Sequence, residues 1–482
     1  MILTQLTSPG PLHLSITLAD HSTLYLDTLV RVLKGRRLVC RGRWNGQAVY
    51  AKLFMGKDAA RYTRRDADGA QAMGQAGIRT PDLLWHGTFD HQSDQVFGLL
   101  YAEVPHAMDA EAAYLQSDDA SRCHLLCALV EVLARQHAAN LCQTDLHLKN
   151  FLLADALVWA IDGDGIRQQS ISLKQAHMQL AELIAKLHVL DQMQMTEMLL
   201  QTYLKVRGWT ETFPATQVLA WARQMKTHEV ERFVTRKLLR NCSDVSWYRD
   251  SHSAQSVTTA GGLHITDLPA LEVAMHCGQV LKAGNTCTVV HTQLQDRAVV
   301  IKRYNIKHCW HALSRAWRPS RAMSSWQNAH RLRYYGMLTP QPLLMYERRF
   351  YGLRGRAYFV SAYSPWPDVN TFFQQCSDQG MRQHVIEQLV TLCYQWFLLR
   401  ISHGDMKASN LQITGQGEIV VIDLDSMEQH RRPQMALRAH AKDIRRLLQN
   451  WQADTSLYNA LVKSFSLVYQ DHTPLKLAGI SI

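Results

Sequence analysis

Short runs of alternating apolar and polar residues occupy positions 12–54 and 271–304, and this alternation predicts β-strands. Longer stretches with apolar residues at helical spacing follow each of these regions. Helices are predicted in the first half over 120–140, 171–205 and 216–240, and in the second half over 380–400, 434–451 and 456–468. Each half of the chain is therefore predicted to place strands first and helices later.

The two halves also share a series of short sequence landmarks. The apolar runs AVYAKLF at 48–54 and AVVIKRY at 298–304 place Lys52 and Lys302 at equivalent positions. Three further pairs follow in the same order: GIRTP with GMLTP, QTDLHLKNFLL with HGDMKASNLQI, and VWAIDGDGI with IVVIDLDSM. The spacing agrees as well, because the Thr-Pro corner precedes the loop aspartate by 64 residues in one copy and 65 in the other.

Such ordered repetition predicts two homologous domains of about 240 residues. We expect the first domain at 1–245 and the second at 269–482. The polar stretch 246–268 is rich in Ser, Thr and Gly and poor in aliphatic periodicity, so we predict a linker there.

Composition narrows the class of protein further. Hydrophobic residues make up 47% of the chain, which is ample for sizeable cores and excludes a mainly disordered protein. No run approaches 18 apolar residues, and no basic start precedes an apolar core, so neither a membrane span nor a secretory signal is expected. The 10 cysteines form no Cys-x-x-Cys pair, which indicates reduced thiols in a cytoplasmic protein without structural zinc.

Net charge is unevenly divided between the halves. Residues 1–240 carry a net charge of +2 and residues 241–482 a net charge of +9. The second half is therefore expected to meet an anionic partner, such as nucleic acid, acidic lipid headgroups or a phosphorylated substrate.

The repeated polar residues are those that phosphoryl transfer from ATP requires. A strand lysine neutralises phosphate charge, a loop aspartate orients the attacking hydroxyl, and an asparagine with a later aspartate holds Mg²⁺ through hard oxygen ligands. Asp-x-x-x-x-Asn before an apolar strand, followed by Ile-Asp, occurs in both copies. The metal pairs would be Asn410 with Asp423 and Asn150 with Asp162.

HGDMKASN followed by VIDLD resembles the protein-kinase-like superfamily, in the variant of bacterial small-molecule and lipid-sugar kinases. The second copy, with VVIKRYN, SRAWRPSRAMSSWQNAHRL, GMLTP and KDIRRLLQNW, is similar to the InaA/WaaP family of lipopolysaccharide core kinases. The resemblance covers roughly 270–450 and, more weakly, 25–170. It implies an α+β fold of two tandem kinase-like domains, each with a small β-rich N-lobe and a larger helical C-lobe.

The resemblance also implies roles for single residues. Lys302 would bind the ATP phosphates, Asp405 would be the base, and Asn410 and Asp423 would bind Mg²⁺. In the first copy the equivalent residues are, in the same order, Lys52, Asp145, Asn150 and Asp162. Lys407 and Lys149 are further candidates, because a basic side chain in this loop can neutralise the charge of the phosphoryl group during transfer. The alternative for Lys407 is an ordinary surface lysine.

The two copies differ around these residues. The first has Gln143-Thr144 in place of His403-Gly404, but it offers a helix acid, Asp66, to pair with its strand lysine. The second has no acid between Asp296 and Glu347, so either Gln327 substitutes or the phosphates alone orient the lysine. Asp425 either supports the site from behind or caps its own loop, and we favour the cap. The first copy is either active or a regulatory relative.

The stretch 302–333 combines eight Lys and Arg residues with three tryptophans and no acid. A solvated helical face or a nucleic-acid contact could share this composition, but no nucleic-acid-binding module is recognisable. Arginine and tryptophan suit an anionic acceptor or headgroup surface better.

Together these features predict an ATP- and Mg²⁺-dependent kinase for a lipopolysaccharide core sugar, expected to be heptose. It would act in the cytoplasm, at the inner face of the inner membrane, and in contact with anionic lipid. The alternatives are a small-molecule kinase of the aminoglycoside or choline type and a non-catalytic scaffold for core assembly.

Overall fold

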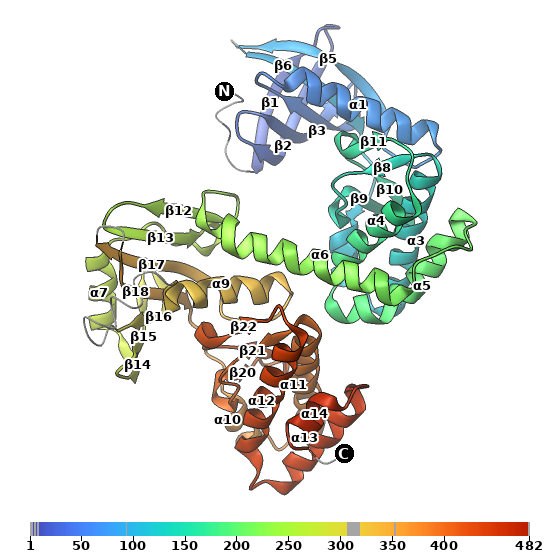
Figure 1. Cartoon of the computed structure of the whole chain (residues 1–482). Helices are drawn as coiled ribbons and strands as arrows, with labels where there is room; N and C mark the ends of the chain where they lie inside the picture. The colour runs from blue at the N-terminus through green and yellow to red at the C-terminus, as the bar shows by residue number, and fades with distance from the viewer. Residues whose placement is uncertain are drawn as a thin grey trace. The chain divides into compact units, whose positions relative to one another are not determined.

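The chain divides into two units, and the division falls inside a helix rather than in a linker (Figure 1). The computed structural model describes residues 3, 6, 9–92, 94–305, 319–350 and 353–480. One unit comprises Met1–Leu187 and Asp191–Met225, and the other comprises His188–Leu190 and Lys226–Ile482. The boundary therefore lies within α6 (Ala215–Arg236), some twenty residues before the predicted end of the first domain.

The first unit begins with an antiparallel sheet of six strands in the order β1-β2-β3-β4-β6-β5. Its strands are β1 (Gly10–Thr17), β2 (Thr23–Leu33), β3 (Arg37–Trp44), β4 (Gln47–Phe54), β5 (Leu83–His91) and β6 (Asp94–Ala102). The hairpin between β3 and β4 turns at Asn45-Gly46, where both residues have positive φ, as a tight two-residue turn requires. The strands predicted over 12–54 are thus confirmed.

Helix α1 (Ala59–Gln75) joins β4 to β5, and a helical region follows the sheet. Its elements are α2 (Ala110–Gln116), α3 (Asp119–Ala138), α4 (Leu173–Ala185), α5 (Val189–Arg207) and the first half of α6, with short strands β8 (Leu141–Gln143), β9 (Phe151–Ala154), β10 (Leu157–Ala160) and β11 (Ile166–Gln168) between α3 and α4. The predicted helix 171–205 is two helices that break after Ala185.

The second unit contains a seven-stranded sheet in the order β12-β13-β17-β18-β16-β15-β14. Its strands are β12 (Val245–Arg249), β13 (Ser253–Thr258), β14 (Gln279–Ala283), β15 (Cys287–Leu294), β16 (Arg297–Tyr304), β17 (Pro342–Phe350) and β18 (Leu353–Ala362). The predicted linker 246–268 is wrong, because β12 overlaps its start, β13 lies within it, and β13 is buried along its whole length between β12 and β17. The Ser and Thr residues of β13 belong to a buried strand and not to a solvent-exposed linker.

Helix α7 (Leu268–Cys277) covers one face of this sheet, so the first residues of the predicted β region 271–304 are helical. Leu271 and Met275 of α7 pack against sheet residues that include Val290 and Ile301. Because side chains alternate along a strand, the neighbours of Ile301 point to the opposite face. Helix α9 (Arg321–Tyr334) contributes to the core on that opposite side through Trp326.

The helical part of the second unit follows β18. It consists of α10 (Val369–Gln375), α11 (Gln379–Leu399), α12 (Pro433–Leu448), α13 (Thr455–Val468) and α14 (Thr473–Leu477), with short strands β19 (Ile401–Ser402), β20 (Leu411–Ile413), β21 (Ile419–Val421) and β22 (Glu428–Gln429) after α11. The three helices predicted here are confirmed. In each unit a sheet is followed by helices, as predicted for an α+β fold, and this mixture fits a kinase-like fold. No helix in the described ranges is long and apolar enough to cross a membrane.

In the first unit, α1 packs against the loop after β10 through two glycines. A Cβ on Gly69 would lie 2.0 Å from the carbonyl oxygen of Gly163, and a Cβ on Gly163 would lie 2.1 Å from that of Asp66. Neither backbone can move aside without separating the helix from the loop. This close approach holds Asp66, on α1, beside Asp162, which directly precedes Gly163.

Gly69→Ala should therefore destabilise the first unit by about 1–3 kcal/mol, because the added methyl group overpacks a backbone contact. Gly74→Ala on the same helix is the matched control. A Cβ there meets nothing within 4 Å, and alanine favours a helix over glycine by about 1 kcal/mol. Urea unfolding of both variants tests the contact, and equal stability of the two would contradict it.

Candidate active site

Lys302 lies on β16, an inner strand of the sheet, and contacts the helical part of the second unit. It follows Ile301 on β16, so it points away from α7. Its ammonium forms an ion pair with Asp423 and lies 3.0 Å from Asp425 Oδ2. The structure thus brings together the strand lysine and the candidate metal aspartate that the sequence placed 121 residues apart.

Burial and opposite charge act against each other on this pair. Burial alone would lower the pKa of Lys302, but Tyr304, Asp425 and Asp423 together raise it above its usual range. Burial would likewise raise the pKa of Asp423, but the charge of Lys302 and its hydrogen bond lower it. Both groups are therefore held ionised, as phosphate and cation binding require.

Asp425 is a partner of Lys302 rather than a loop cap, so the favoured interpretation of this residue is wrong. Its side chain is 4% exposed and also accepts a hydrogen bond of 2.7 Å from Arg321, at the start of α9. Gln327 does not substitute for a helix acid, because its amide donates to the carbonyl of Val234 at 3.1 Å. Support of the site was the other role that the sequence offered for Asp425, whereas Arg321 was counted only as part of the basic stretch 302–333.

The loop that carries Asp405 is fixed from two sides. His403 is fully buried, stacks on Trp396, and lies 3.0 Å through Nε2 from the carbonyl of Ile422. The backbone N–H groups of His403 and Gly404 donate to the carboxylate of Asp443 on α12, at 2.6 and 3.1 Å. Asp443 therefore supports the backbone of this loop, and the sequence did not identify it, although an acid on the buried face of a helix was a possible signal.

Asp405 and Asn410 lie within hydrogen-bonding reach of one another. The Asn410 amide donates to the Asp405 carbonyl at 2.9 Å, and the Ile422 N–H donates to the Asn410 carbonyl at 2.9 Å. Asp423 follows at once, in the left-handed conformation with φ 61°. The three candidate side chains of this loop and strand are therefore placed by one connected set of backbone contacts.

These residues fit a magnesium ion. Asn410 uses its amide nitrogen within the loop, and in the described part of the chain its amide oxygen accepts no hydrogen bond. With the carboxylate of Asp423 it forms a pair of hard oxygen ligands of the kind Mg²⁺ prefers. These two residues would hold the ion, and Lys302 would meet the phosphates beside it.

Two basic side chains meet the carboxylate of Asp405. Lys407 Nζ lies 3.1 Å from Oδ2, and Arg446 Nε of α12 lies 3.8 Å from Oδ1. Lys407 is thus turned toward the candidate base, which favours the role in charge neutralisation over that of an ordinary surface lysine. Arg446 was not identified from the sequence.

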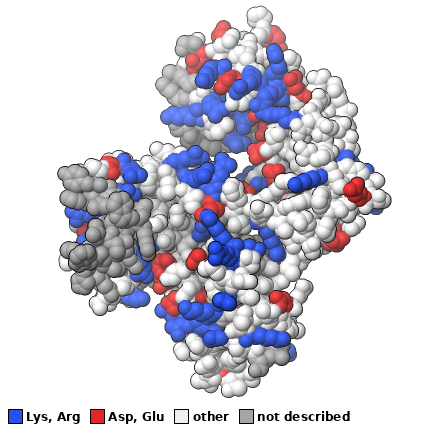
Figure 2. Space-filling view, viewed as in Figure 1, with Lys and Arg blue, Asp and Glu red and all other residues white. Residues whose placement is uncertain are grey.

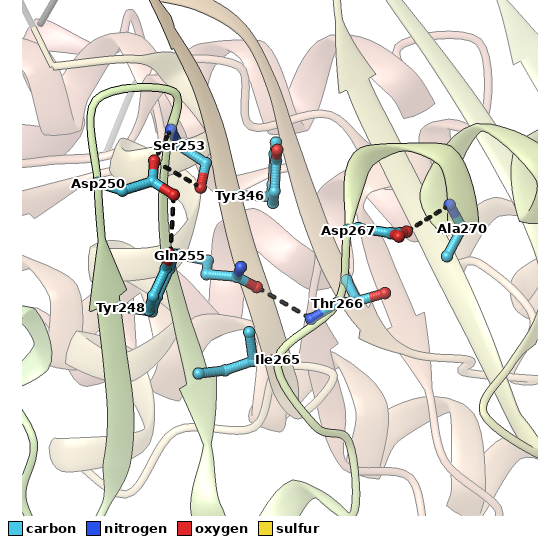
Figure 3. Close-up of a pocket in the computed structure, with 9 residues that line it drawn as sticks. All are labelled: Tyr248, Asp250, Ser253, Gln255, Ile265, Thr266, Asp267, Ala270 and Tyr346. Carbon is cyan, nitrogen blue, oxygen red and sulfur yellow. Dashed lines mark hydrogen bonds between the residues drawn. The ribbon is translucent and has the colours of Figure 1, made fainter.

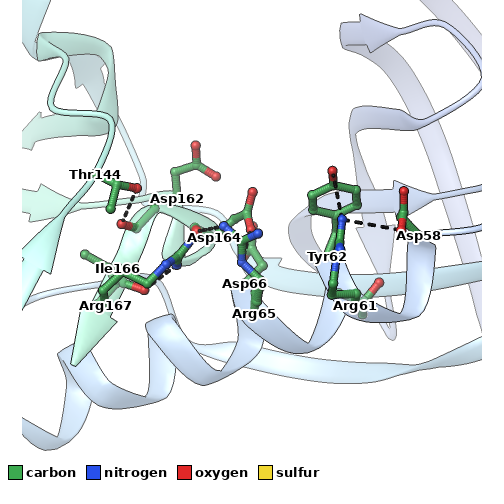
Figure 4. A network of polar contacts seen from close by, with 12 residues as sticks. Asp58, Arg61, Tyr62, Arg65, Asp66, Thr144, Asp162, Asp164, Ile166 and Arg167 are labelled. Atoms are coloured by element: carbon green, nitrogen blue, oxygen red, sulfur yellow. Dashed lines mark hydrogen bonds and ion pairs between the residues drawn. The ribbon is translucent and has the colours of Figure 1, made fainter. Parts of the chain in front are cut away.

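In the first unit the lysine is held by a helix acid, as predicted. Lys52 Nζ lies 2.7 Å from Asp66 Oδ2 and 3.2 Å from Asp162 Oδ1. Asp66 is fully buried, and Tyr101 donates to it at 2.6 Å. Figure 4 shows Asp66, Asp162 and Asp164 near one another. Arg65 of α1 forms an ion pair with Asp164, with 3.1 Å between Nε and Oδ1.

The loop of the first unit is built differently from its counterpart. The Asn150 amide donates to the Asp145 carbonyl at 2.7 Å, which repeats the contact of the second unit. Support from α4 comes through Gln179, whose amide donates to the carbonyl of Gln143 at 2.7 Å. Lys149 is turned to Glu111 of α2, 2.9 Å away, so the structure does not bring it to Asp145.

A shallow pocket of about 590 Å³ in the second unit lies apart from these residues (Figure 3). It is lined by β12, β13, β17 and the start of α7, with Gln255 and Tyr346 facing it. Tyr346 packs with Ile301 in the cluster under α7, so the pocket opens on the face of the sheet opposite Lys302. It takes no part in the candidate active site.

The basic and aromatic stretch 302–333 is described only in part. Its residues Lys307, Trp310, Arg315, Trp317 and Arg318 lie outside the described residues. Within α9, Trp326 is fully buried and Arg331 pairs with Glu231 at 2.7 Å, so these two side chains serve the core of the unit and not a solvated surface.

Asp443 should make the stability of the second unit depend on pH. Burial raises its pKa to about 6, so its ionisation favours the unfolded chain as the pH rises from about 4 to about 6. Wild type should lose up to about 3 kcal/mol of stability over this range relative to Asp443→Asn, at about 1.4 kcal/mol per pKa unit. Urea unfolding of both proteins at pH 4 and pH 7 measures this, and an unchanged difference would contradict the assignment.

The comparisons with known proteins concern the second unit. Residues 273–469 match the family model of the lipopolysaccharide kinase (Kdo/WaaP) family, and no curated protein matches the chain. The matched segment includes Lys302, Asp405, Asn410 and Asp423. Kinases of this family transfer a phosphoryl group to sugar hydroxyls of lipopolysaccharide. Residues 273–469 span less than half of the chain, and over this segment the second unit is similar to the lipopolysaccharide kinase (Kdo/WaaP) family, whose members are phosphotransferases.

Proposed function

We propose that the second unit transfers the terminal phosphoryl group of ATP to a hydroxyl of a lipopolysaccharide inner-core sugar, with heptose as the acceptor. The observation that carries the proposal is the ion pair of Lys302 with Asp423, next to the loop of Asp405 and Asn410. A strand lysine, a loop aspartate and an oxygen pair for a cation then converge within one unit.

Each residue has a distinct task in this reaction. Lys302 binds phosphate oxygens, and Asn410 with Asp423 would hold Mg²⁺, which neutralises phosphate charge when bound. Asp405 orients the acceptor hydroxyl and accepts its proton as the sugar oxygen bonds to phosphorus and the bond to the ADP oxygen breaks. Lys407 supplies positive charge beside that carboxylate.

An anionic acceptor suits the surface beside Asp405. Three exposed basic residues follow one face of α12 at intervals of four: Arg438, Lys442 and Arg446. We name them the α12 stripe. Its last member, Arg446, lies 3.8 Å from Asp405, so the stripe leads to the reacting hydroxyl. Figure 2 shows Lys and Arg side chains gathered over the helical part of this unit.

The first unit offers a second nucleotide site in this proposal. Lys52, Asp145, Asn150 and Asp162 repeat the arrangement, and the buried Asp66 completes the lysine pair. We propose tandem kinase-like domains that both bind Mg·ATP, with the second doing most of the transfer. The place of action is the cytoplasmic face of the inner membrane, in contact with anionic lipid.

Replacing the base should separate chemistry from binding. Asp405→Asn should keep nucleotide affinity within about twofold and lower kcat by about 10²–10⁴, since only the proton path is damaged. Transfer of labelled phosphate from ATP to purified core acceptor measures this, with Asp145→Asn as the matched variant of the first unit. Wild-type turnover in the double variant Asp145→Asn/Asp405→Asn would refute the kinase proposal.

The α12 stripe should determine the affinity for the acceptor. Arg438→Ala/Lys442→Ala leaves the loop contacts intact and should raise the KM for a phosphorylated core acceptor about tenfold, with kcat unchanged, because charge-assisted contacts are lost. The control Lys463→Ala/Lys476→Ala removes the same charge from exposed positions of α13 and α14. Equal KM values for the two variants would exclude this surface as the acceptor site.

A further inference from the structure

The second unit cannot hold its strand lysine with a helix acid. No Asp or Glu occurs between Asp296 and Glu347, so α9 carries none. Ser325 takes the position of Asp66, because each lies eleven residues before the glycine of the Gly-x-x-Thr-Pro corner. Its hydroxyl lies 2.7 Å from the hydroxyl of Tyr304, so it offers the lysine no charge.

Asp425 supplies the missing carboxylate from the loop instead. It is 4% exposed, lies 3.0 Å from Lys302 Nζ and 2.7 Å from Arg321 Nη2. A buried carboxylate is stable only with such partners, and here one cation comes from the sheet and one from the start of α9. In the second unit α9 thus contributes the arginine that pairs with this loop carboxylate, whereas in the first unit α1 also contributes the acid that pairs with the lysine.

The equivalent residue in the first unit has a different partner. Asp164 also lies two residues after the metal aspartate, but it is 23% exposed and pairs with Arg65 at 3.1 Å. The contacts of Lys52 are instead with Asp66 and Asp162. In both units this loop carboxylate therefore pairs with an arginine of the helix, and in the second unit it also contacts the strand lysine.

A second anchor matters once a cation is bound. Asp423 pairs with Lys302 and is also the carboxylate expected to hold Mg²⁺. If that carboxylate turns to the ion, Lys302 loses a partner at the moment it must meet the phosphates. Asp425 keeps a negative charge on the lysine in both situations.

We propose that Asp425 is the positioning residue of Lys302 and that Arg321 links it to α9. This inference rests on the proposed nucleotide site of the second unit. It assigns to Asp425 the task that Asp66 has in the first unit, and it makes the orientation of α9 part of nucleotide binding through the salt bridge between Arg321 and Asp425.

The test measures binding of an ATP analogue with Mg²⁺ in a Lys52→Ala background, so that only the second unit is observed. Asp425→Asn should weaken binding at least tenfold. Adding Ser325→Asp should restore it to within about threefold, because Tyr304 can donate to the new carboxylate as Tyr101 donates to Asp66.

In a Lys302→Ala background, Asp164→Asn should leave binding by the first unit unchanged, whereas Asp66→Asn should weaken it.

Unchanged affinity in Asp425→Asn would overturn the proposal, and so would a folded Asp425→Asn/Ser325→Asp protein that still binds ten times more weakly. If the single variant does not fold, the double variant alone decides. Because the readout is binding, failure of this inference differs from failure of the proposed function, which would appear as nucleotide binding without transfer to any core acceptor.

Discussion

A largely buried lysine on an inner strand of each sheet is the constraint on which the rest of the site depends. An ammonium group taken out of water must meet carboxylates, and the chain must bring those carboxylates from distant segments. In the second unit they come from the loop after β21, and in the first from α1 and the loop after β10. The ion pair therefore fixes the sheet against the loop that carries the metal aspartate.

That single contact extends into the catalytic loop. The N–H of Ile422 donates to the carbonyl of Asn410, and the carbonyl of Ile422 contacts the imidazole Nε2 of His403. The segment that presents Asp423 therefore also positions the loop of Asp405. Asp443 holds the other side of the loop from α12. Lysine, base and metal ligands are thus parts of one hydrogen-bonded framework, and the first unit reaches a similar geometry with different supports.

Periodicity and repetition predicted much of this from the sequence. The strands, most helices and the pairing of Lys52 with Asp66 followed from spacing and residue type. The linker prediction failed because composition does not distinguish a solvated Ser/Thr-rich segment from a buried strand, and β13 is buried only because β12 and β17 flank it. The roles of Asp425 and Asp443 depend on partners far away in sequence, so local pattern could not assign them.

The central claim is that the second unit carries the transfer of phosphate. Removing the metal carboxylate of each unit in turn tests it most directly, with Asp162→Ala and Asp423→Ala assayed for Mg²⁺-dependent transfer from labelled ATP to purified core acceptor. The account predicts that Asp423→Ala abolishes transfer while Asp162→Ala retains most of it. Loss of transfer in Asp162→Ala with full transfer in Asp423→Ala would contradict the claim and assign catalysis to the first unit.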